Sequence, residues 1–373
     1  MINFSHRNSC NLLQLSLLSI AITTLSTSST HAFTFSSGEL EGSLDTTISY
    51  GARWRLQDRD NAIIGIANGG TAYSVNGDDG NLNYDKGLVS NVIKITPEMV
   101  LRYRNYGAFV RGTYFYDFEV MGNDTARTPL SDAAKGEVGE KAELLDAYVW
   151  GSWNPGEKPL DVRIGNQVVN WGESTFIQGG MNSINPVNVN SLRVPGAELR
   201  EALKPVPRLW ANFGATDKVS VEGFYQTHWE ETIIDPVGSY FSSSDLAGKG
   251  AEKVGLGFGS APDIPAFPTT AVPRGDTREA KDGGEYGISM NYLTNSDTEF
   301  GFYFVNYHSR LPIISAQTGS VAGAVGGDYP ASARYFLEYP EDIKILGTSF
   351  NTQVGTSGIS WQGELTYKID APL

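Results

Sequence analysis

Most of the chain from residue 43 onward alternates apolar and polar residues with a period of two. From residue 361 to residue 370, the odd positions are Trp, Gly, Leu, Tyr and Ile, and the even positions are Gln, Glu, Thr, Lys and Asp. A period of two places successive side chains on opposite faces of a β-strand. The alternation predicts about eleven strands, over residues 43–55, 90–104, 107–119, 143–153, 161–171, 207–215, 218–230, 284–294, 298–309, 343–353 and 359–370.

The connections between these segments alternate between short and long. Short turns such as Asn154-Pro155-Gly156 and Thr216-Asp217 are separated by long connections, which span 56–89, 120–142, 172–206, 231–283 and 310–342. Outer-membrane barrels have this pattern, with tight periplasmic turns and long outer loops. The sequence therefore predicts an all-β fold, an antiparallel transmembrane β-barrel whose apolar face meets lipid and whose polar face lines a lumen.

Two features qualify this prediction. A secreted or surface β-sandwich that binds glycans or apolar ligands through Trp and Tyr also alternates its faces, although sandwich strands average about 5–6 residues and need not have long loops on one side. Bacterial barrels usually have an even number of strands, and sheet edges are not tolerated in lipid. An odd count near eleven therefore predicts an incomplete barrel, truncated at its C-terminal end.

The N-terminal 32 residues have the layout of a secretory signal peptide. Arg7 precedes an apolar run from Leu12 to Leu25, and Thr30-His31-Ala32 has the small-x-small form of a cleavage site. Cleavage would leave 33–373 as a partial outer-membrane barrel domain, exported to the outer membrane of a Gram-negative bacterium. The only cysteine, Cys10, would leave with the peptide. Disulfides, a thiol nucleophile and a thiolate metal site are then excluded.

Composition narrows the class of protein further. Glycine accounts for 42 of 373 residues and aromatic residues for 11%, and this excess of glycine disfavours a helical bundle. The formal net charge of the chain is −14, whereas a nucleic-acid binder is expected to carry a basic surface. After residue 32 there is no apolar run near the roughly 20 residues that a membrane helix needs.

The polar faces and the 172–206 connection supply the candidate functional residues. A short helix is predicted from Pro195 to Leu203, because proline suits a first helical turn and another proline follows at 205. Such a loop could fold inward and constrict a pore, or remain an outer loop that its helix stabilises. The candidate constriction residues are Asn182, Asn185, Asn188, Arg193, Glu198 and Arg200. The expected lumen-lining residues are Arg111, Asp117, Glu119, Arg163, Gln167, Glu222, Gln226, Glu364 and Lys368.

Two weaker candidates come from acidic residues and histidines. The Gly-rich stretch that contains Asp78, Asp79, Asn81, Asn83 and Asp85 offers oxygen ligands for calcium. It lacks the spacing and terminal Glu of an EF-hand, so a polar turn is the preferred interpretation. Strand parity puts His228 and Glu230 on one face, but no nucleophile motif or third metal ligand accompanies them. We therefore expect no catalytic residue, cofactor or resident metal.

Two long motifs carry a resemblance to a known family. The first runs through 163–174, 182–188 and 192–203, and the second is Gly80-Asn81-Leu82-Asn83-Tyr84-Asp85-Lys86-Gly87. With these motifs the chain resembles, over nearly its whole mature length, the uncharacterised proteobacterial domain-of-unknown-function family thirteen hundred and two. The resemblance implies an exported, outer-membrane-barrel-like protein, in a family considered alongside the transport or export of hydrophobic compounds, and it supplies no catalytic residues. Members are typically longer, which agrees with the predicted truncation.

Together these features predict a passive channel or substrate-specific porin for small, including hydrophobic, compounds. Its expected partners are outer-membrane lipid, a small-molecule permeant and envelope transport proteins, but not nucleic acid. We expect no enzymatic activity.

Overall fold

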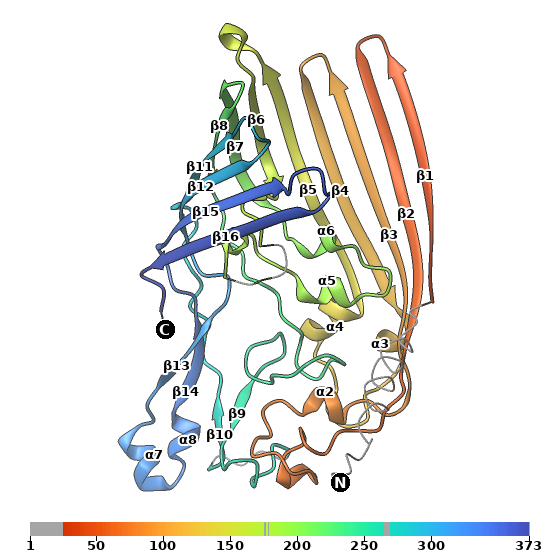
Figure 1. Ribbon diagram of the computed structural model, residues 1–373. Coiled ribbons are helices and arrows are strands. Elements are labelled where there is room, and N and C mark those ends of the chain that lie inside the picture. Colours follow the sequence, from red (N-terminus) through yellow and green to blue (C-terminus); the bar gives the residue numbers. More distant parts are fainter. Residues whose placement is uncertain (1–24, 175–176, 178, 265–268, 373) are drawn as a thin grey trace, which may run out of the picture.

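One large antiparallel sheet dominates the computed structural model, which describes residues 25–174, 177, 179–264 and 269–372 (Figure 1). The sheet has twelve strands in the order β1-β2-β3-β4-β5-β6-β7-β8-β11-β12-β15-β16. These strands are β1 (Leu25–Ser37), β2 (Leu40–Arg55), β3 (Gly87–Tyr103), β4 (Tyr106–Asp117), β5 (Glu140–Trp153), β6 (Leu160–Gln167), β7 (Val206–Thr216), β8 (Val219–Gln226), β11 (Glu285–Leu293), β12 (Glu299–Tyr307), β15 (Ile343–Gln353) and β16 (Ser360–Ile369).

The two faces of the sheet differ as the alternating sequence predicts. On β11, Ile288 and Met290 project from the convex face and are 54% and 43% exposed, whereas Ser289 between them is 1% exposed. We call the convex face the outer face. It carries exposed apolar side chains on every strand of the large sheet from β2 to β16. They include Leu44, Ile48, Trp54, Tyr103, Tyr114, Leu144, Val149, Ile164, Leu209, Tyr225, Ile288, Phe302, Leu346 and Leu365.

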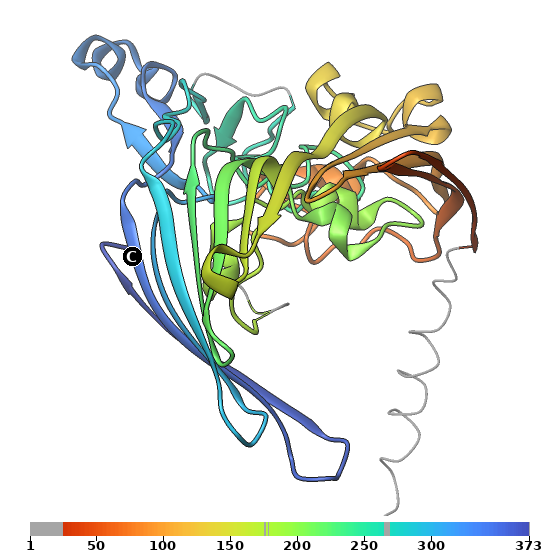
Figure 2. The same cartoon turned by 90° about the horizontal axis from the view of Figure 1, so that it is seen from above.

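The sheet is curved but open. β1 and β16 form its two edges, and each is paired on one side only among the described residues. Seen from above, the strands form an arc (Figure 2). We call the concave side of this arc the inner face. The all-β antiparallel fold is thus confirmed, while the sheet itself is not a closed barrel.

Each of the eleven predicted segments matches one strand of the large sheet, and the structure corrects their number and some of their ends. A twelfth strand, β1, includes residues that the sequence analysis assigned to the signal peptide; the rest of that peptide, 1–24, lies outside the described residues. β6 ends at Gln167 and β8 at Gln226, so the strand pattern does not extend to Trp171 or His228.

The short turns lie at one end of the sheet and the long connections at the other (Figure 1). The long connections contain two small antiparallel sheets, formed by β9 (Lys253–Gly255) with β10 (Ala271–Pro273) and by β13 (Ile313–Gln317) with β14 (Arg334–Glu338). The helices of the long connections are α2 (Asp79–Leu82), α3 (Phe118–Gly122), α4 (Asp132–Val138), α5 (Val189–Arg193), α6 (Leu199–Ala202), α7 (Val321–Gly326) and α8 (Tyr329–Ser332). Their 3-10 turns are η1 (Ile66–Asn68) and η3 (Met181–Ile184), whereas η2 (Pro155–Glu157) lies in the short turn between β5 and β6. No helix in the described part of the chain is long and apolar enough to span a membrane.

The main buried apolar cluster lies on the inner face. Met181 and Ile184 of η3 pack there against side chains of β7, β8, β12 and β15. The cluster consists of Val169, Trp171, Met181, Ile184, Trp210, Phe224, Tyr303, Val305, Tyr307, Ile343 and Ile345. The core therefore forms between the sheet and the connection that follows β6.

Candidate functional site

The connection from β6 to β7 folds back onto the inner face of the sheet (Figure 2). We call residues 168–205 the inward segment; the structure describes all of them except 175–176 and 178. The inward segment packs closely against β2 because Gly51 has no side chain there. A Cβ added to Gly51 would lie 2.5 Å from the Cβ of Pro195. The side chains that hold this segment form the candidate functional site.

Glu364 on β16 anchors the start of the inward segment. One of its oxygens, Oε2, accepts a hydrogen bond from the backbone N–H of Glu173 at 2.8 Å, and Oε1 accepts one from the N–H of Met181, also at 2.8 Å. Lys368 on the same strand lies 3.3 Å from the hydroxyl of Ser183. Both predicted lumen residues therefore face inward, and both bind the segment.

A buried polar network continues this attachment across β7 and β8. Arg208, which is fully buried, donates from Nη1 to Asn185 Oδ1 at 2.6 Å and from Nε to Gln226 Oε1 at 3.0 Å. Gln167 donates from Nε2 to the Arg208 carbonyl at 2.9 Å. Asn185 also donates to the carbonyl of Val169 at 2.7 Å. Gln167, Gln226 and Asn185 were predicted site residues, whereas Arg208 was not.

Further members of the network were not predicted from the sequence. Arg310 pairs with Glu285 at 2.7 Å, and both side chains are almost completely buried. The backbone N–H of His308 donates to Glu285 Oε1 at 3.1 Å. The His308 ring is held on both sides: Nδ1 accepts the N–H of Asp342, and Nε2 lies 3.0 Å from the Gly283 carbonyl. These residues come together only through strand pairing, so no local pattern identifies them.

The inward segment contains two short helices in place of the single helix predicted from Pro195 to Leu203. Asn188 caps α5 by accepting the N–H groups of Asn190 and Ser191, and Glu198 with Glu201 forms a capping box for α6. Between the helices Gly196 adopts φ 79°, a left-handed conformation that a continuous helix cannot contain.

Charged pairs connect α6 to the wall of the sheet. Glu201 pairs with Lys94 at 2.5 Å, and both side chains are buried. Arg200 pairs with Glu98 at 2.8 Å and its carbonyl accepts from Arg111 at 3.3 Å. Arg111 is also paired with Asp146 on β5. Of the candidate constriction residues, Arg200 and Glu198 keep about half of their side-chain surface exposed, so their charged groups remain accessible on the inner side of the sheet.

The remaining constriction candidates bind protein groups. Arg193 pairs with Asp235 at 3.0 Å and lies over the ring of Phe241, 4.6 Å from its centroid. Burial raises the pKa of Asp235. Asn182 donates to the carbonyls of Ser174 and Ile177. Arg193 and Asn182 therefore hold the inward segment in place.

Two predicted lumen residues are placed differently from expectation. Asp117 ends β4 and caps α3, because its carboxylate accepts the N–H groups of Glu119 and Val120. Asp117 also accepts from Ser90 and Asn91, so its oxygens are engaged. Glu119 lies in α3 and not on a strand, which corrects the predicted end of this strand at 119.

An aromatic cluster with one arginine lies on the inner face nearer the short turns. The Arg163 guanidinium is 4.3 Å from the ring centroid of Trp210 and 5.7 Å from that of Tyr148. Phe109 and Trp150 extend the cluster, with ring centroids 5.6 and 6.1 Å from that of Tyr148. Predicted Arg163 is therefore on the inner face; the aromatic partners were not predicted.

Glu222 connects this aromatic cluster to the inward segment. It accepts indole N–H groups from Trp171 at 2.8 Å and from Trp210 at 3.3 Å. The inner face thus combines carboxylates, guanidinium groups and aromatic rings around the docked segment.

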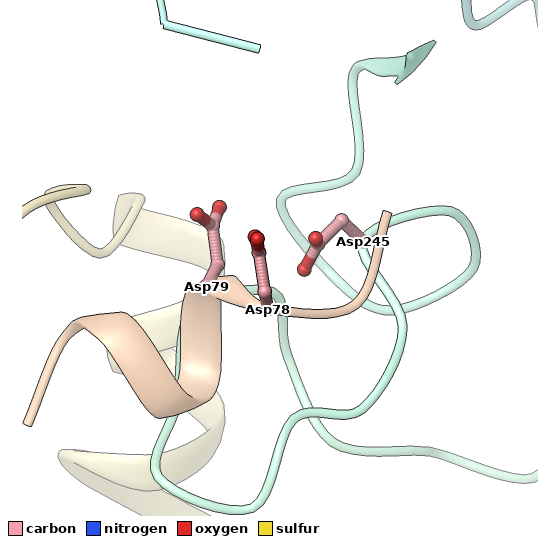
Figure 3. A group of neighbouring side chains, drawn as sticks. All are labelled: Asp78, Asp79 and Asp245. Atoms are coloured by element: carbon pink, nitrogen blue, oxygen red, sulfur yellow. The ribbon is translucent and has the colours of Figure 1, made fainter. Parts of the chain in front are cut away.

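The five weak calcium candidates do not come together as one group of ligands. Asn81 binds Arg55, Asn83 binds the carbonyls of Thr128 and Gly238, and Asp85 pairs with Arg59. Asp78 and Asp79 instead meet Asp245 from a distant loop (Figure 3). Burial, reinforced by the charges of these two neighbours, raises the pKa of Asp245 to about 8.

The predicted pair of His228 and Glu230 forms at the loop end of the sheet. His228 Nε2 lies 3.6 Å from Glu230, and Nδ1 lies 2.8 Å from Asp282. A backbone hydrogen bond from Trp229 holds the pKa of Asp282 below its usual value. The His228 side chain is half exposed, as expected of a residue at the rim.

Sequence comparison places the chain in a family without assigning an activity. No curated protein matches this sequence. A family model described as "Protein of unknown function (DUF1302)" matches residues 13–373. The chain therefore belongs to this family of proteins of unknown function.

Proposed function

We propose that the large sheet is the wall of an outer-membrane β-barrel that lets small molecules pass, and that the inward segment constricts the passage. The observation that carries this proposal is the contrast between the two faces. Apolar side chains remain exposed on the outer face along successive strands, while the buried ion pairs and the polar network lie inside.

An exposed apolar surface of this extent is unfavourable in water and favourable against lipid. Soluble monomers seldom expose contiguous apolar patches larger than a few hundred Å². The alternative of a secreted sandwich needs two facing sheets with apolar inner surfaces. A single sheet with its apolar side chains outward does not favour that alternative.

Barrel formation in lipid also requires partners for the two sheet edges. The backbone groups along the free sides of β1 and β16 would be costly in hydrocarbon unless another strand pairs with them. The proposal therefore requires that other strands pair with these two edges in the membrane.

The inner face favours permeants with an apolar or aromatic part. Trp210, Tyr148 and Trp150 provide flat apolar surfaces, and Arg163 among them provides a positive charge. Small aromatic carboxylates combine the two features that such a cluster can bind.

Reconstitution tests this function directly. The protein in planar bilayers should give discrete conductance steps, and vesicles containing it should swell faster in benzoate than in a sugar. Arg163→Ala should reduce the preference for benzoate, whereas Lys218→Ala, in the exposed turn between β7 and β8, should leave it unchanged. Repeated absence of conductance and swelling would contradict the proposal.

A further inference from the structure

Three aspartates from two connections that are distant in sequence lie side by side (Figure 3). Asp78 and Asp79 lie at the start of α2, in the connection between β2 and β3, and Asp245 lies in the connection between β8 and β11. One carboxylate oxygen from each lies within 4.8 Å of the other two. Three ionised carboxylates this close repel one another unless something positive lies between them.

Several oxygens of this cluster accept no hydrogen bond from the described residues, although Asp79 Oδ1 accepts from Arg127 and Thr128. Asp78 is fully buried; its Oδ2 accepts from the N–H of Gly65 at 2.8 Å and from Asn68 at 2.9 Å. Its other oxygen, Oδ1, accepts no hydrogen bond from the described residues. Both carboxylate oxygens of Asp245 are likewise buried, and neither finds a donor within the described part of the chain. Buried carboxylate oxygens without donors are rare and point to a missing ligand.

Nearby positive charges are too few to neutralise the site. A fourth carboxylate, Asp263, shares Arg127 with Asp79, at 2.5 and 2.6 Å respectively. The same guanidinium remains 3.9 Å from Asp78 Oδ1. Lys253 reaches the carbonyl of Asp263 at 2.6 Å. When all four carboxylates are ionised, four negative and two positive charges leave a net charge of −2, which equals the charge that one divalent cation neutralises.

We propose that Asp78, Asp79 and Asp245 bind a calcium ion that fastens these two loops together. Calcium takes six to eight hard oxygen ligands in irregular geometry, whereas magnesium requires a near-ideal octahedron. Asp78 and Asp245 supply free oxygens, and an adjoining cavity of about 160 Å³, lined by Asp79, Asp245, Thr128 and Asp263, has room for water ligands. The site lies outside the strands of the sheet, so it does not depend on the proposed channel.

The test compares thermal unfolding of the detergent-solubilised protein in EDTA, in CaCl₂ and in MgCl₂. Calcium should raise the midpoint, with a dissociation constant on the order of 10⁻⁴–10⁻³ M, as in extracellular calcium modules. Calorimetric titration with CaCl₂ should give the same constant. Asp245→Asn should abolish the response and, because it removes repulsion without removing a hydrogen bond, should raise the midpoint in EDTA.

Asp276→Asn is the matched control, since Asp276 is an exposed aspartate in the same loop as Asp245. This variant should respond to calcium like the unmodified protein. Asp78→Asn should also lose the response, which provides a second ligand variant if Asp245→Asn does not fold. No calcium effect on the unmodified protein, an equal effect of magnesium, or a normal response in Asp245→Asn would overturn the proposal.

Discussion

At the scale of single residues, the inner face is held together by charges that are buried in pairs. Lys94 and Glu201 lie 2.5 Å apart with little exposure, and Arg310 and Glu285 lie 2.7 Å apart with almost none. Removing one partner of a buried pair is expensive, because the other charge stays buried without compensation. The Lys94–Glu201 pair therefore fixes the position of the inward segment more firmly than a surface pair could, and Arg310 adds a hydrogen bond to the carbonyl of Ile184.

Replacing Glu201 by Gln tests this claim. The substitution leaves Lys94 buried beside a neutral amide, and the free energy of unfolding should fall by about 3 kcal/mol. Glu39→Gln, which removes the exposed pair of Glu39 with Arg104, is the control and should cost less than about 1 kcal/mol. Denaturant titration of both variants provides the comparison. Equal losses would show that the Lys94–Glu201 pair does not hold the segment.

At the scale of elements, docking of the inward segment depends on the absence of a side chain at Gly51. A Cβ there would lie 2.5 Å from Pro195, whose ring cannot move away as a flexible side chain could. At Gly223 on β8, by contrast, an added Cβ would have its nearest neighbour at 3.5 Å. Gly223 is therefore the control for Gly51: both are strand glycines, but only at Gly51 would an added Cβ clash with the inward segment.

Gly51→Ala should loosen the inward segment, and Gly223→Ala should not. Limited proteolysis should cut between residues 189 and 204 at least several-fold faster in Gly51→Ala, and single-channel conductance should rise. Unchanged cleavage and conductance in Gly51→Ala would mean that this contact does not position the segment.

The strands could be predicted from the sequence because their pattern is local. Period-two alternation identified eleven of the twelve strands of the large sheet, and it missed β1 because part of that strand resembles the end of a signal peptide. The site could be predicted only in part. Glu364 was expected on the inner face, but its bonds to Glu173 and Met181 join residues that are remote in sequence. Likewise, Asp245 joins Asp78 only through loop packing.

At the scale of the whole molecule, the sheet exposes apolar side chains on its outer face and buries polar ones on its inner face, which is the opposite of the arrangement in a soluble protein. Tyr286, Ile288 and Met290 on β11 are exposed on the outer face, while Glu285 and Ser289 of the same strand are buried inside. The central claim is that the outer face lies against lipid. β11 is suited to test it, because it is paired on both sides, with β8 and β12.

Site-directed spin labelling along β11 is the most direct test. Single cysteines at positions 286 to 292, with Cys10 replaced by serine, would carry a nitroxide in vesicles containing the protein. The label should be accessible to oxygen and shielded from a water-soluble nickel chelate at 286, 288, 290 and 292, and less accessible to oxygen at 287, 289 and 291, which face inward. This period-two oscillation is the predicted result; equal access of the nickel chelate to the labels at 288 and 290 would contradict the account.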